Sequence, residues 1–245
     1  MNLKTCILTA NNCFKANKSM KPTGIVVHST GVNNPNVKRY VQPLKSDANY
    51  NLIINDLGVN AYGNHWNQPT PNGKQICVHG FIGKNAQGEV VTYQTLPYEI
   101  SCWGCGRGSK GSYNYDPTGR IQFEICEDSL TDKEYFNAVY KEATEFCAYL
   151  CKKYGFGVDK ISSHAEAAKA GYASNHGDPD HWFRKFGKNM NLFRGDVSKL
   201  LSANTSTTST KKYYVQTGVF SVKANAEAMV KKLKAAGFDA FIKEQ

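Results

Sequence analysis

Long apolar runs and an export signal are both missing from this sequence of 245 residues. No apolar run approaches the ~18 residues that a membrane-spanning helix needs, so we expect no membrane insertion. The stretch from Met1 to Met20 is rich in Lys, Asn and Thr, and it has no apolar core of the ~7–15 residues typical of secretory signals. We therefore expect synthesis in the cytoplasm without a signal peptide.

Acidic residues are also scarce, since 20 Asp and Glu stand against 30 Lys and Arg and leave a net charge of +10. Such an excess predicts an anionic partner but not its class. Residues 211–245 carry seven Lys against three acidic residues, and the remaining excess is spread over 1–210 without a basic block. Because nucleic-acid-binding domains gather their basic residues on one face or helix, we expect no nucleic-acid partner.

The eight cysteines do not indicate a disulfide scaffold. Such scaffolds are short secreted chains, whereas this chain is long and shows no export signal, so we expect reduced thiols. Apolar residues make up 41% and aromatic residues 12% of the sequence. This is enough to fill a core and excludes a wholly disordered chain.

A change of composition divides the chain near residue 202. Residues 202–210 contain only Ser, Thr, Ala and Asn, with no charge and no large apolar side chain. Such a stretch buries too little surface to offset its ordering entropy, which predicts a flexible linker, placed here at 202–211. The sequence thus predicts a catalytic domain over 1–201 and a small unit over 212–245.

Short β-branched or alternating runs predict strands at 24–28, 51–54, 90–93, 121–126 and 161–163. A capping-box pattern from Thr131 to Glu134 opens a run of apolar residues at helical spacing, and Gly155 should end that helix. Cys147 and Cys151 fall on its apolar face and should be buried. Strands interleaved with a strong helix predict an α/β fold with a mixed central sheet flanked by helices.

Three regions bring histidines into chemically useful contexts. His28 ends an apolar strand, His164 follows another, and residues 176–183 read His-Gly-Asp-Pro-Asp-His-Trp-Phe. A catalytic zinc site needs three protein ligands, commonly His with a carboxylate or Cys, and an open position for water. These residues are far apart in sequence, so their spacing alone does not identify a metal site. A single His is more often a hydrogen-bonded structural residue.

The order of five motifs gives this pattern a family resemblance. Over roughly 20–190 the chain resembles the zinc-dependent N-acetylmuramoyl-L-alanine amidases, the type-2 amidases that include phage endolysins and are related to peptidoglycan recognition proteins. The motifs are Ile25-Val-Val-His-Ser-Thr-Gly31, Tyr50-Asn-Leu-Ile-Ile54, Ile121-Gln-Phe-Glu124, Ser163-His-Ala-Glu166 and Asp178-Pro-Asp-His-Trp-Phe183.

The resemblance implies that His28, His164 and Asp178 are Zn²⁺ ligands. His176 and His181 are rivals for the third place, because both are chemically competent. Asp178 is preferred because the family's aspartate directly precedes a proline, as Asp178 precedes Pro179.

The resemblance also implies three catalytic residues. Glu124 stands at the family's acidic position and would serve as the general acid or base, although such a Glu is as often a solvent-facing strand residue. Tyr50 matches a tyrosine that some members place beside the metal, where it would bind the attacking water or the oxyanion. His176 stands where several relatives carry Lys, which leaves the choice of oxyanion donor between His176 and Tyr50 open.

The Cys102-Trp-Gly-Cys105 motif is a lone CxxC, without the second pair that a zinc knuckle requires. We interpret it as a loop that lines the substrate groove. Trp103 is then a candidate sugar-binding platform and the predicted substrate-binding residue.

The tail resembles the first half of the sporulation-related SPOR repeat, which binds peptidoglycan glycan strands. The likeness rests on Tyr214, Gln216 and Phe220, taken as wall-binding residues, and on a βαβ pattern with strands at 213–220 and 238–242. Ala226, Met229, Val230 and Leu233 mark one helix face. Because the second half of the repeat is missing, two tails would complete the sheet in a homodimer.

Taken together, the resemblance implies a peptidoglycan hydrolase that cuts the amide between N-acetylmuramic acid and L-alanine during cell lysis, as a phage endolysin or an autolysin. It would reach the cell wall only after release from the cytoplasm. The alternative is a muropeptide-binding module without catalysis on the same fold. The presence of Asp178 as a third ligand favours the enzyme.

Overall fold

The computed structural model describes residues 1–203, 218–236 and 240–242. The chain divides into two compact units, Met1–Ser206 and Thr207–Gln245, and each is described by itself.

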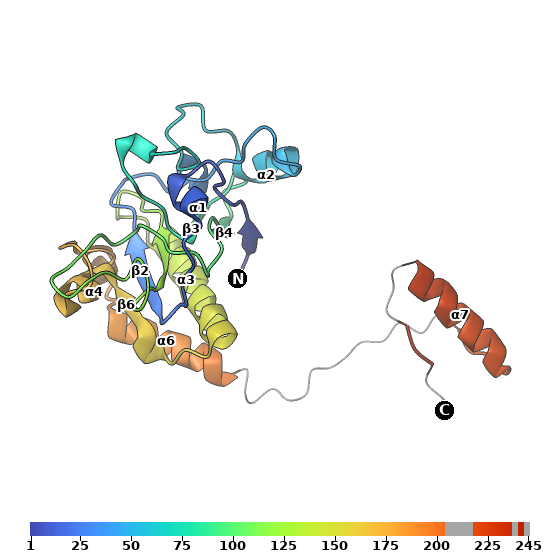
Figure 1. Cartoon of the computed structure of the whole chain (residues 1–245). Coiled ribbons are helices and arrows are strands. Elements are labelled where there is room, and N and C mark those ends of the chain that lie inside the picture. Colours follow the sequence, from blue (N-terminus) through green and yellow to red (C-terminus); the bar gives the residue numbers. More distant parts are fainter. Residues whose placement is uncertain (204–217, 237–239, 243–245) are drawn as a thin grey trace. The chain divides into compact units, whose positions relative to one another are not determined.

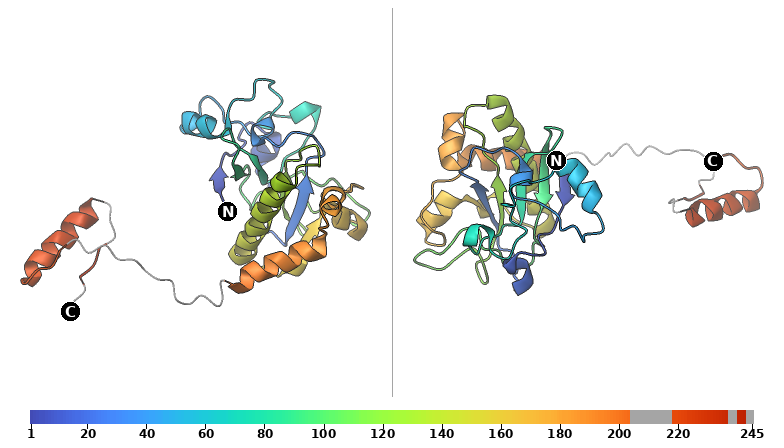
Figure 2. Two further views of the ribbon diagram at one scale, coloured as in Figure 1. Left: turned by 180° about the vertical axis from the view of Figure 1, so that it is seen from behind. Right: turned by 90° about the horizontal axis from the view of Figure 1, so that it is seen from above.

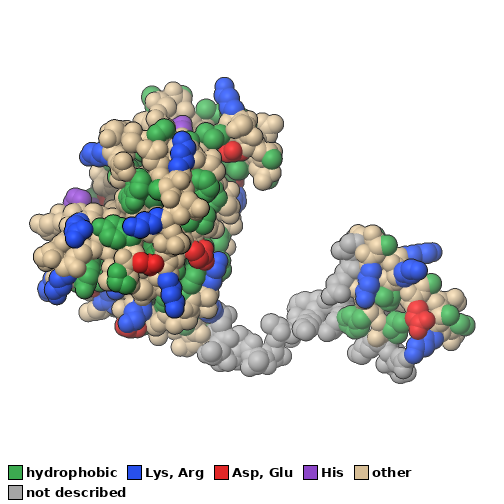
Figure 3. Space-filling model, viewed as in Figure 1, with side chains coloured by type: hydrophobic (Ala, Val, Ile, Leu, Met, Phe, Trp, Pro, Cys, Tyr) green, Lys and Arg blue, Asp and Glu red, His purple; other side chains and the backbone are tan. Residues whose placement is uncertain are grey.

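On the face drawn in Figure 3, Lys and Arg side chains of the first unit are scattered among polar and apolar ones. None of the described helices is both long and apolar enough to cross a membrane.

The first unit is built on a mixed six-stranded sheet in the order β1-β4-β3-β5-β2-β6 (Figure 1). All neighbouring strands are parallel except β3 and β4. The strands are β1 (Leu3–Thr5), β2 (Ile25–Ser29), β3 (Gly80–Lys84), β4 (Val90–Gln94), β5 (Ile121–Ile125) and β6 (Ile161–Ser163). The strands predicted near 24, 90, 121 and 161 are therefore confirmed, as is the α/β class.

The patterns of these strands match their positions in the sheet. β2 lies between β5 and β6 and is buried along its whole length, as expected of a continuous apolar strand covered on both faces. In β5 the alternation assigns the two faces: Ile121, Phe123 and Ile125 join the main core, while Gln122 and Glu124 project from the opposite face.

One face of the sheet is covered by α3 (Lys133–Tyr154), α5 (Asp180–Lys185) and α6 (Met190–Ala203) (Figure 2, left). The predicted helix is confirmed in α3, which Gly155 ends in the left-handed conformation, and Cys147 and Cys151 are buried in it. Its start differs by one residue, because the carboxylate of Asp132, and not Thr131, caps the helix by accepting from the Tyr135 amide.

Shorter elements complete the unit: α1 (Asn12–Ala16), α2 (Tyr50–Leu57), α4 (His164–Ala170) and the 3-10 turns η1 (Val37–Arg39), η2 (Pro71–Gly73) and η3 (Val158–Lys160). α2 and α4 pack on the other face, whereas Val158 of η3 packs against the same core as α3 and α6. The prediction of a strand at 51–54 is wrong, since these residues form α2. Ile53 and Leu57 are four residues apart and pack into the same apolar cluster, whereas Leu52 is 72% exposed. This is a helical period that the short run Leu-Ile-Ile concealed.

All eight cysteines are free and buried. Burial raises the pKa of Cys6 to about 12 and that of Cys151 to about 11, and it also raises the pKa of Cys102, Cys126 and Cys147 well above the ordinary value. These five thiols therefore stay protonated near neutral pH.

In the second unit the described residues contain one helix, α7 (Lys223–Ala235). Its predicted face is confirmed: Ala226, Met229, Val230 and Leu233 are partly shielded, although no residue of α7 is buried. The strand predicted at 213–220 falls mostly outside the described residues, and 218–220 form no strand. The other predicted strand is not formed by residues 240–242 either.

Phe136 anchors α3 to α5 and to the turn after it, because its ring contacts those of Trp182, Phe183 and Phe186 at centroid distances of 5.4, 5.9 and 4.4 Å. We expect Phe136→Ala to lower the free energy of unfolding by about 3–5 kcal/mol, the usual cost of a cavity of this size. Denaturant unfolding measures it. Leu52→Ala on the exposed side of α2 is the control and should change stability by less than ~0.5 kcal/mol. If both variants lost the same free energy of unfolding, Phe136 would not anchor α3 to α5.

Candidate metal centre

The site lies where the parallel strands β2, β5 and β6 end. Their carboxyl ends meet at one edge of the sheet, the usual place for ligands in open α/β sheets. His28 of β2 stands opposite Glu124 of β5 in the register. Val27 stands opposite Ser163, the last residue of β6, so His164 comes directly after that strand. The pairing alone brings two histidines and a glutamate to the same edge.

Asp178 completes a compact group with the two histidines. The Nδ1 atoms of His28 and His164 are 3.0 Å apart, and each lies 3.3 Å from a carboxylate oxygen of Asp178. One potential ligand atom from each of the three residues lies within 4.8 Å of the others. Among the described residues this is the single group of three or more His, Cys, Asp or Glu with that geometry.

Local structure holds each of these residues in place. Ser163 and Glu166 form a capping box at the start of α4, which sets the backbone at His164. Asp178 lies two residues before α5, and one of its carboxylate oxygens accepts from the amide of Ser29 at 3.3 Å. The backbone carbonyl of Asp178 accepts from the Ala165 amide at 3.3 Å, which ties this segment to α4.

The electrostatics of the group favour a neutral imidazole at His28 and an ionised carboxylate at Asp178. Burial lowers the pKa of His28, which is 1% exposed. Burial of Asp178 opposes its ionisation, but the hydrogen bonds from His164 and His28 outweigh it and hold the pKa of the carboxyl below its ordinary value. Neutral imidazole nitrogens and a carboxylate are the ligand forms that a divalent cation requires.

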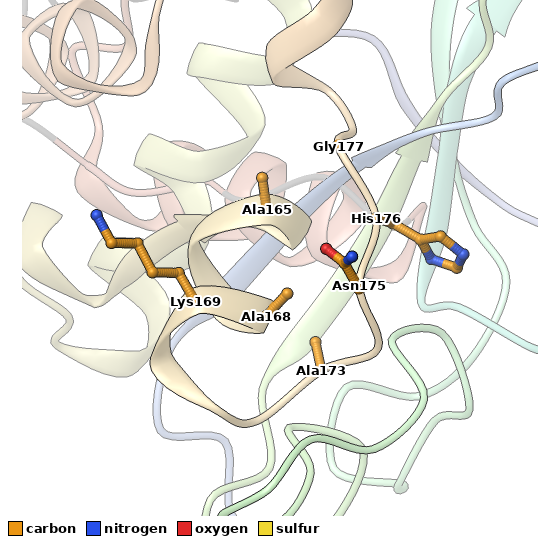
Figure 4. A pocket seen from close by; sticks show the side chains of 7 residues that line it. All are labelled: Ala165, Ala168, Lys169, Ala173, Asn175, His176 and Gly177. Atoms are coloured by element: carbon orange, nitrogen blue, oxygen red, sulfur yellow. The ribbon is translucent and has the colours of Figure 1, made fainter.

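The two rival histidines lie outside this group. His181 pairs with the buried carboxylate of Glu127, its Nε2 lying 3.1 Å from Oε1. His176 is exposed, and its ring meets that of His164 edge-on at a centroid distance of 4.7 Å. Figure 4 shows its imidazole on the opposite side of the 173–177 segment from the α4 alanines. Both histidines lie near the site, but neither takes the place of Asp178 in the three-residue group.

Glu124 is partly exposed, but its Oε2 atom is buried and has no hydrogen-bond partner among the described residues. Burial, together with the nearby carboxylates of Asp178 and Glu127, raises the pKa of Glu124 well above its ordinary value. An unpartnered carboxyl oxygen beside a cluster of possible ligands is suited to hold and release a proton.

The remaining predicted residues lie around this centre. Trp103 is half-buried and lines a hollow of about 480 Å³ with Lys74 and His176. His176 also lines a second hollow of about 570 Å³, against α4. Tyr50 lies at the start of α2 and is half-buried. No hydrogen bond joins it to the group of His28, His164 and Asp178. Tyr214 and Gln216 lie outside the described residues, while Phe220 is 39% exposed.

Two polar residues of the site, Gln122 and Glu127, were given no role by the sequence reasoning, although Gln122 lies within the motif Ile121-Gln-Phe-Glu124. Gln122 accepts a hydrogen bond from His28, with 3.1 Å between Oε1 and Nε2, and Glu127 accepts from both Ser29 and His181. The signal available for Gln122 was its position: it is a polar residue on the same face of β5 as Glu124. Glu127 follows the strand and carried no comparable signal.

An α/β sheet with a His-His-Asp group at the ends of its parallel strands defines a candidate metallohydrolase. Residues 18–181 match the family described as N-acetylmuramoyl-L-alanine amidase, and residues 209–245 match the SPOR domain. The chain belongs to the N-acetylmuramoyl-L-alanine amidase family, and the family resemblance seen in its motifs is confirmed.

Curated relatives with this name occur in bacilli. The chain is 27% identical over 141 residues to N-acetylmuramoyl-L-alanine amidase CwlA of Bacillus subtilis (strain 168), which covers 54% of this chain and 50% of that protein. It is 31% identical over 128 residues to a probable N-acetylmuramoyl-L-alanine amidase of Bacillus licheniformis, covering 49% and 34%. The chain thus spans half or less of the length of these relatives.

Solved structures share the fold at low sequence identity. The Staphylococcus aureus hydrolase AmiA in complex with its ligand has a TM-score of 0.51 at 16% identity, covering 83% of this chain and 84% of that one. The PlyG catalytic domain has a TM-score of 0.51 at 19% identity, covering 86% and 100%. At these identities the likeness establishes the fold alone.

We predict that Asp178→Ala greatly weakens zinc binding, since two remaining ligands hold a catalytic metal poorly. The loss should exceed the ~10–100-fold that removing a hydrogen-bond partner of a ligand costs. Chelator competition followed by metal analysis of the full chain measures this. His181→Ala is the matched control and should retain the metal. The reverse pattern would make His181 the third ligand.

Proposed function

We propose that this protein is a zinc-dependent peptidoglycan hydrolase that cleaves the amide bond between N-acetylmuramic acid and the L-alanine of the stem peptide. The observation that carries the proposal is the convergence of His28, His164 and Asp178 beside the unpartnered carboxyl of Glu124. Family membership supplies the reaction class, and the site supplies the residues that would perform it.

The donor set fits zinc. Two imidazole nitrogens and one carboxylate oxygen are a common ligand set of catalytic zinc, which keeps a further position for water. The Nδ1 atoms of His28 and His164 would face the ion with one Asp178 oxygen. When bound, zinc lowers the pKa of water towards ~7 and polarises the carbonyl of the scissile amide.

Glu124 would handle the protons of the reaction. Its raised pKa suits a group that takes a proton from the attacking water and returns it to the leaving amine nitrogen of L-alanine. Its place opposite His28 in the strand register keeps the carboxyl beside the ligands. The short backbone distance across a parallel pair limits how far this side chain can move away.

His176 and Tyr50 are the candidates for stabilising the oxyanion. A neutral imidazole can donate one hydrogen bond, and His176 is exposed beside His164 between two hollows. The substrate would then lie over His176 and extend into both hollows, with its sugar in the hollow that Trp103 lines. Tyr50, at the start of α2, would act by donating its phenolic hydrogen to the oxyanion.

The tail would hold the enzyme on its polymer. Its match to the SPOR domain favours binding of peptidoglycan strands, with Tyr214, Gln216 and Phe220 as the contacting residues. The protein would act in bacterial lysis as an endolysin or autolysin, made in the cytoplasm and released to the wall. A non-catalytic muropeptide-binding module is the competing function, and it would lack a use for Glu124.

Digestion of purified peptidoglycan tests the activity. We expect new L-alanine amino termini and no new reducing sugar ends, as mass spectrometry of the products would record. Glu124→Gln keeps the shape of the side chain but removes its proton chemistry, so the rate should fall at least ~100-fold while the zinc content is unchanged. Reducing ends would mean a glycosidase, and full activity in Glu124→Gln would assign the proton transfer elsewhere.

We also propose that two copies pair through the C-terminal unit. No residue of α7 is buried, and Val219 and Val222 are 85% and 53% exposed. Met229, Val230 and Leu233 form an apolar face that is only partly shielded, and such a face is stabilised by a covering surface. A second copy offers an identical one about a two-fold axis.

Light scattering at tens of micromolar distinguishes the assemblies. The full chain should have twice the mass of the monomer, whereas a variant ending at Leu201 should be monomeric, because it lacks the apolar face of α7. A monomeric full chain would refute the pairing. A dimer that survives removal of the tail would place the interface in the first unit.

A further inference from the structure

Gln122 is a buried polar residue whose side chain contacts His28 and which the proposed reaction does not use. It is fully buried in β5, two residues before Glu124 and on the same face. Its side-chain amide contacts His28, a candidate metal ligand, on one side. On the other side it contacts Asn114 of the groove loop, the segment that includes Cys102–Cys105 and Asn114. A fully buried amide with every polar atom partnered is a strong geometric constraint on its neighbours.

The hydrogen bonds of Gln122 determine which way its amide points. The Nε2 atom lies 3.0 Å from the backbone carbonyl of Tyr113 and 3.0 Å from Oδ1 of Asn114. A carbonyl can only accept, so the amide nitrogen must face Tyr113. The Oε1 atom therefore faces Nε2 of His28, 3.1 Å away.

This orientation fixes the proton on His28. Because the Gln122 oxygen can only accept, Nε2 of His28 must carry the hydrogen. The lone pair is then on Nδ1, the atom that faces His164 and Asp178. The amide thus selects the tautomer that can bind a cation and aims its lone pair at the group.

The groove loop forms the socket that holds the amide. Asn114 uses the same Oδ1 to accept from the amides of Gly104 and Cys105, both at 3.1 Å. A Cβ placed on Gly104 would come within 2.5 Å of the Gln122 oxygen and 2.7 Å of Val78 Cγ1. The glycine of Cys102-Trp-Gly-Cys105 is therefore needed for the close approach of the amide to His28.

The backbone of Gln122 is held separately from its side chain. Its amide donates to Nδ1 of His79 at 3.0 Å, and Nε2 of His79 donates to the carbonyl of Ile100 at 2.9 Å. Burial lowers the pKa of His79 to about 4, so this imidazole is neutral at physiological pH. Substitution of the Gln122 side chain leaves this backbone anchor in place.

His164 has no equivalent support. Its Nε2 atom lies 3.4 Å from the hydroxyl of Ser174, a longer contact to a group that can donate or accept. Ser174 donates its one hydrogen to the carbonyl of Cys105 at 3.1 Å, so toward His164 its oxygen accepts in a contact longer than that between Gln122 and His28, and the same oxygen also lies 3.4 Å from His176. The two histidines of the site are thus held unequally.

We propose that Gln122 is a positioning residue that fixes the tautomer and orientation of His28 for metal binding, with Asn114 and Gly104 forming its socket. The proposal rests on the proposed function only in taking zinc as the metal. The Cys102–Cys105 motif then has a structural purpose: its glycine makes room for the amide that sets a ligand. The groove loop and the metal centre become one hydrogen-bonded unit.

Zinc affinity of the full chain, measured by chelator competition, tests the proposal without reference to activity. Gln122→Met removes the acceptor at nearly constant length, and we expect affinity to fall ~10–100-fold. Gly104→Ala keeps every hydrogen-bonding group but displaces the amide, and it should cause a loss in the same range. Ser174→Ala is the matched control on the other histidine and should lose less than about tenfold.

Two further readouts separate positioning from general stability. The Nε2 proton of His28 should give a slowly exchanging proton NMR signal in the zinc-loaded wild type, and this signal should broaden or vanish in Gln122→Met. Thermal unfolding of each metal-free variant reports stability alone. Should Gln122→Met fail to fold, Gly104→Ala carries the test, because it removes no buried partner.

Unchanged zinc affinity in both Gln122→Met and Gly104→Ala would overturn the proposal, even if the metal-free proteins melt earlier. An equal loss in Ser174→Ala would also overturn it, because the effect would then not be specific to His28. The two proposals can fail separately. If the variants lose zinc affinity as expected but the wild type releases no L-alanine termini from peptidoglycan, the positioning role is supported and the proposed reaction is refuted.

Discussion

The parallel pairing of β2 with β5 on one side and β6 on the other is the constraint on which the site depends. Side chains alternate between the faces of a strand, so a slip of one residue in either ladder would move a functional side chain to the other face. The observed register puts His28 opposite Glu124 and ends β6 just before His164. The core under β2 and β5 specifies that register, since Val27, Phe123 and Ile125 must all point into it.

The sequence predicted most clearly the parts of the fold in which local pattern and burial agree. β2, β5 and α3 have long or regular patterns that only one secondary structure satisfies. The segment from Tyr50 to Leu57 was misassigned because three adjacent apolar residues fit a strand as well as a helix. Its helical period is apparent only once Leu57, four residues after Ile53, is seen in the same cluster.

The sequence predicted which three residues gather at the site but not the contacts that support them. Order of motifs pointed to His28, His164 and Asp178, whereas the chemistry of a histidine gave no reason to prefer Asp178 over His181. Three-dimensional pairing separates them, because His181 is paired with Glu127. The sequence placed Gln122 on the same face as Glu124 but not its role, since that role depends on a loop that approaches it only in the folded chain. Hydrogen-bond partners distant in sequence leave no periodic signal.

The burial of all eight thiols has a consequence for the durability of the enzyme. Oxidation and disulfide exchange proceed through the thiolate, whose population falls tenfold for each unit by which the pKa exceeds the pH. With the pKa of Cys6 near 12 and that of Cys151 near 11, these sulfur atoms react slowly and are shielded from reagents. The folded first unit therefore protects these two thiols from oxidants and from disulfide exchange. Unfolding, which would expose these two thiols, is then the event that makes them reactive.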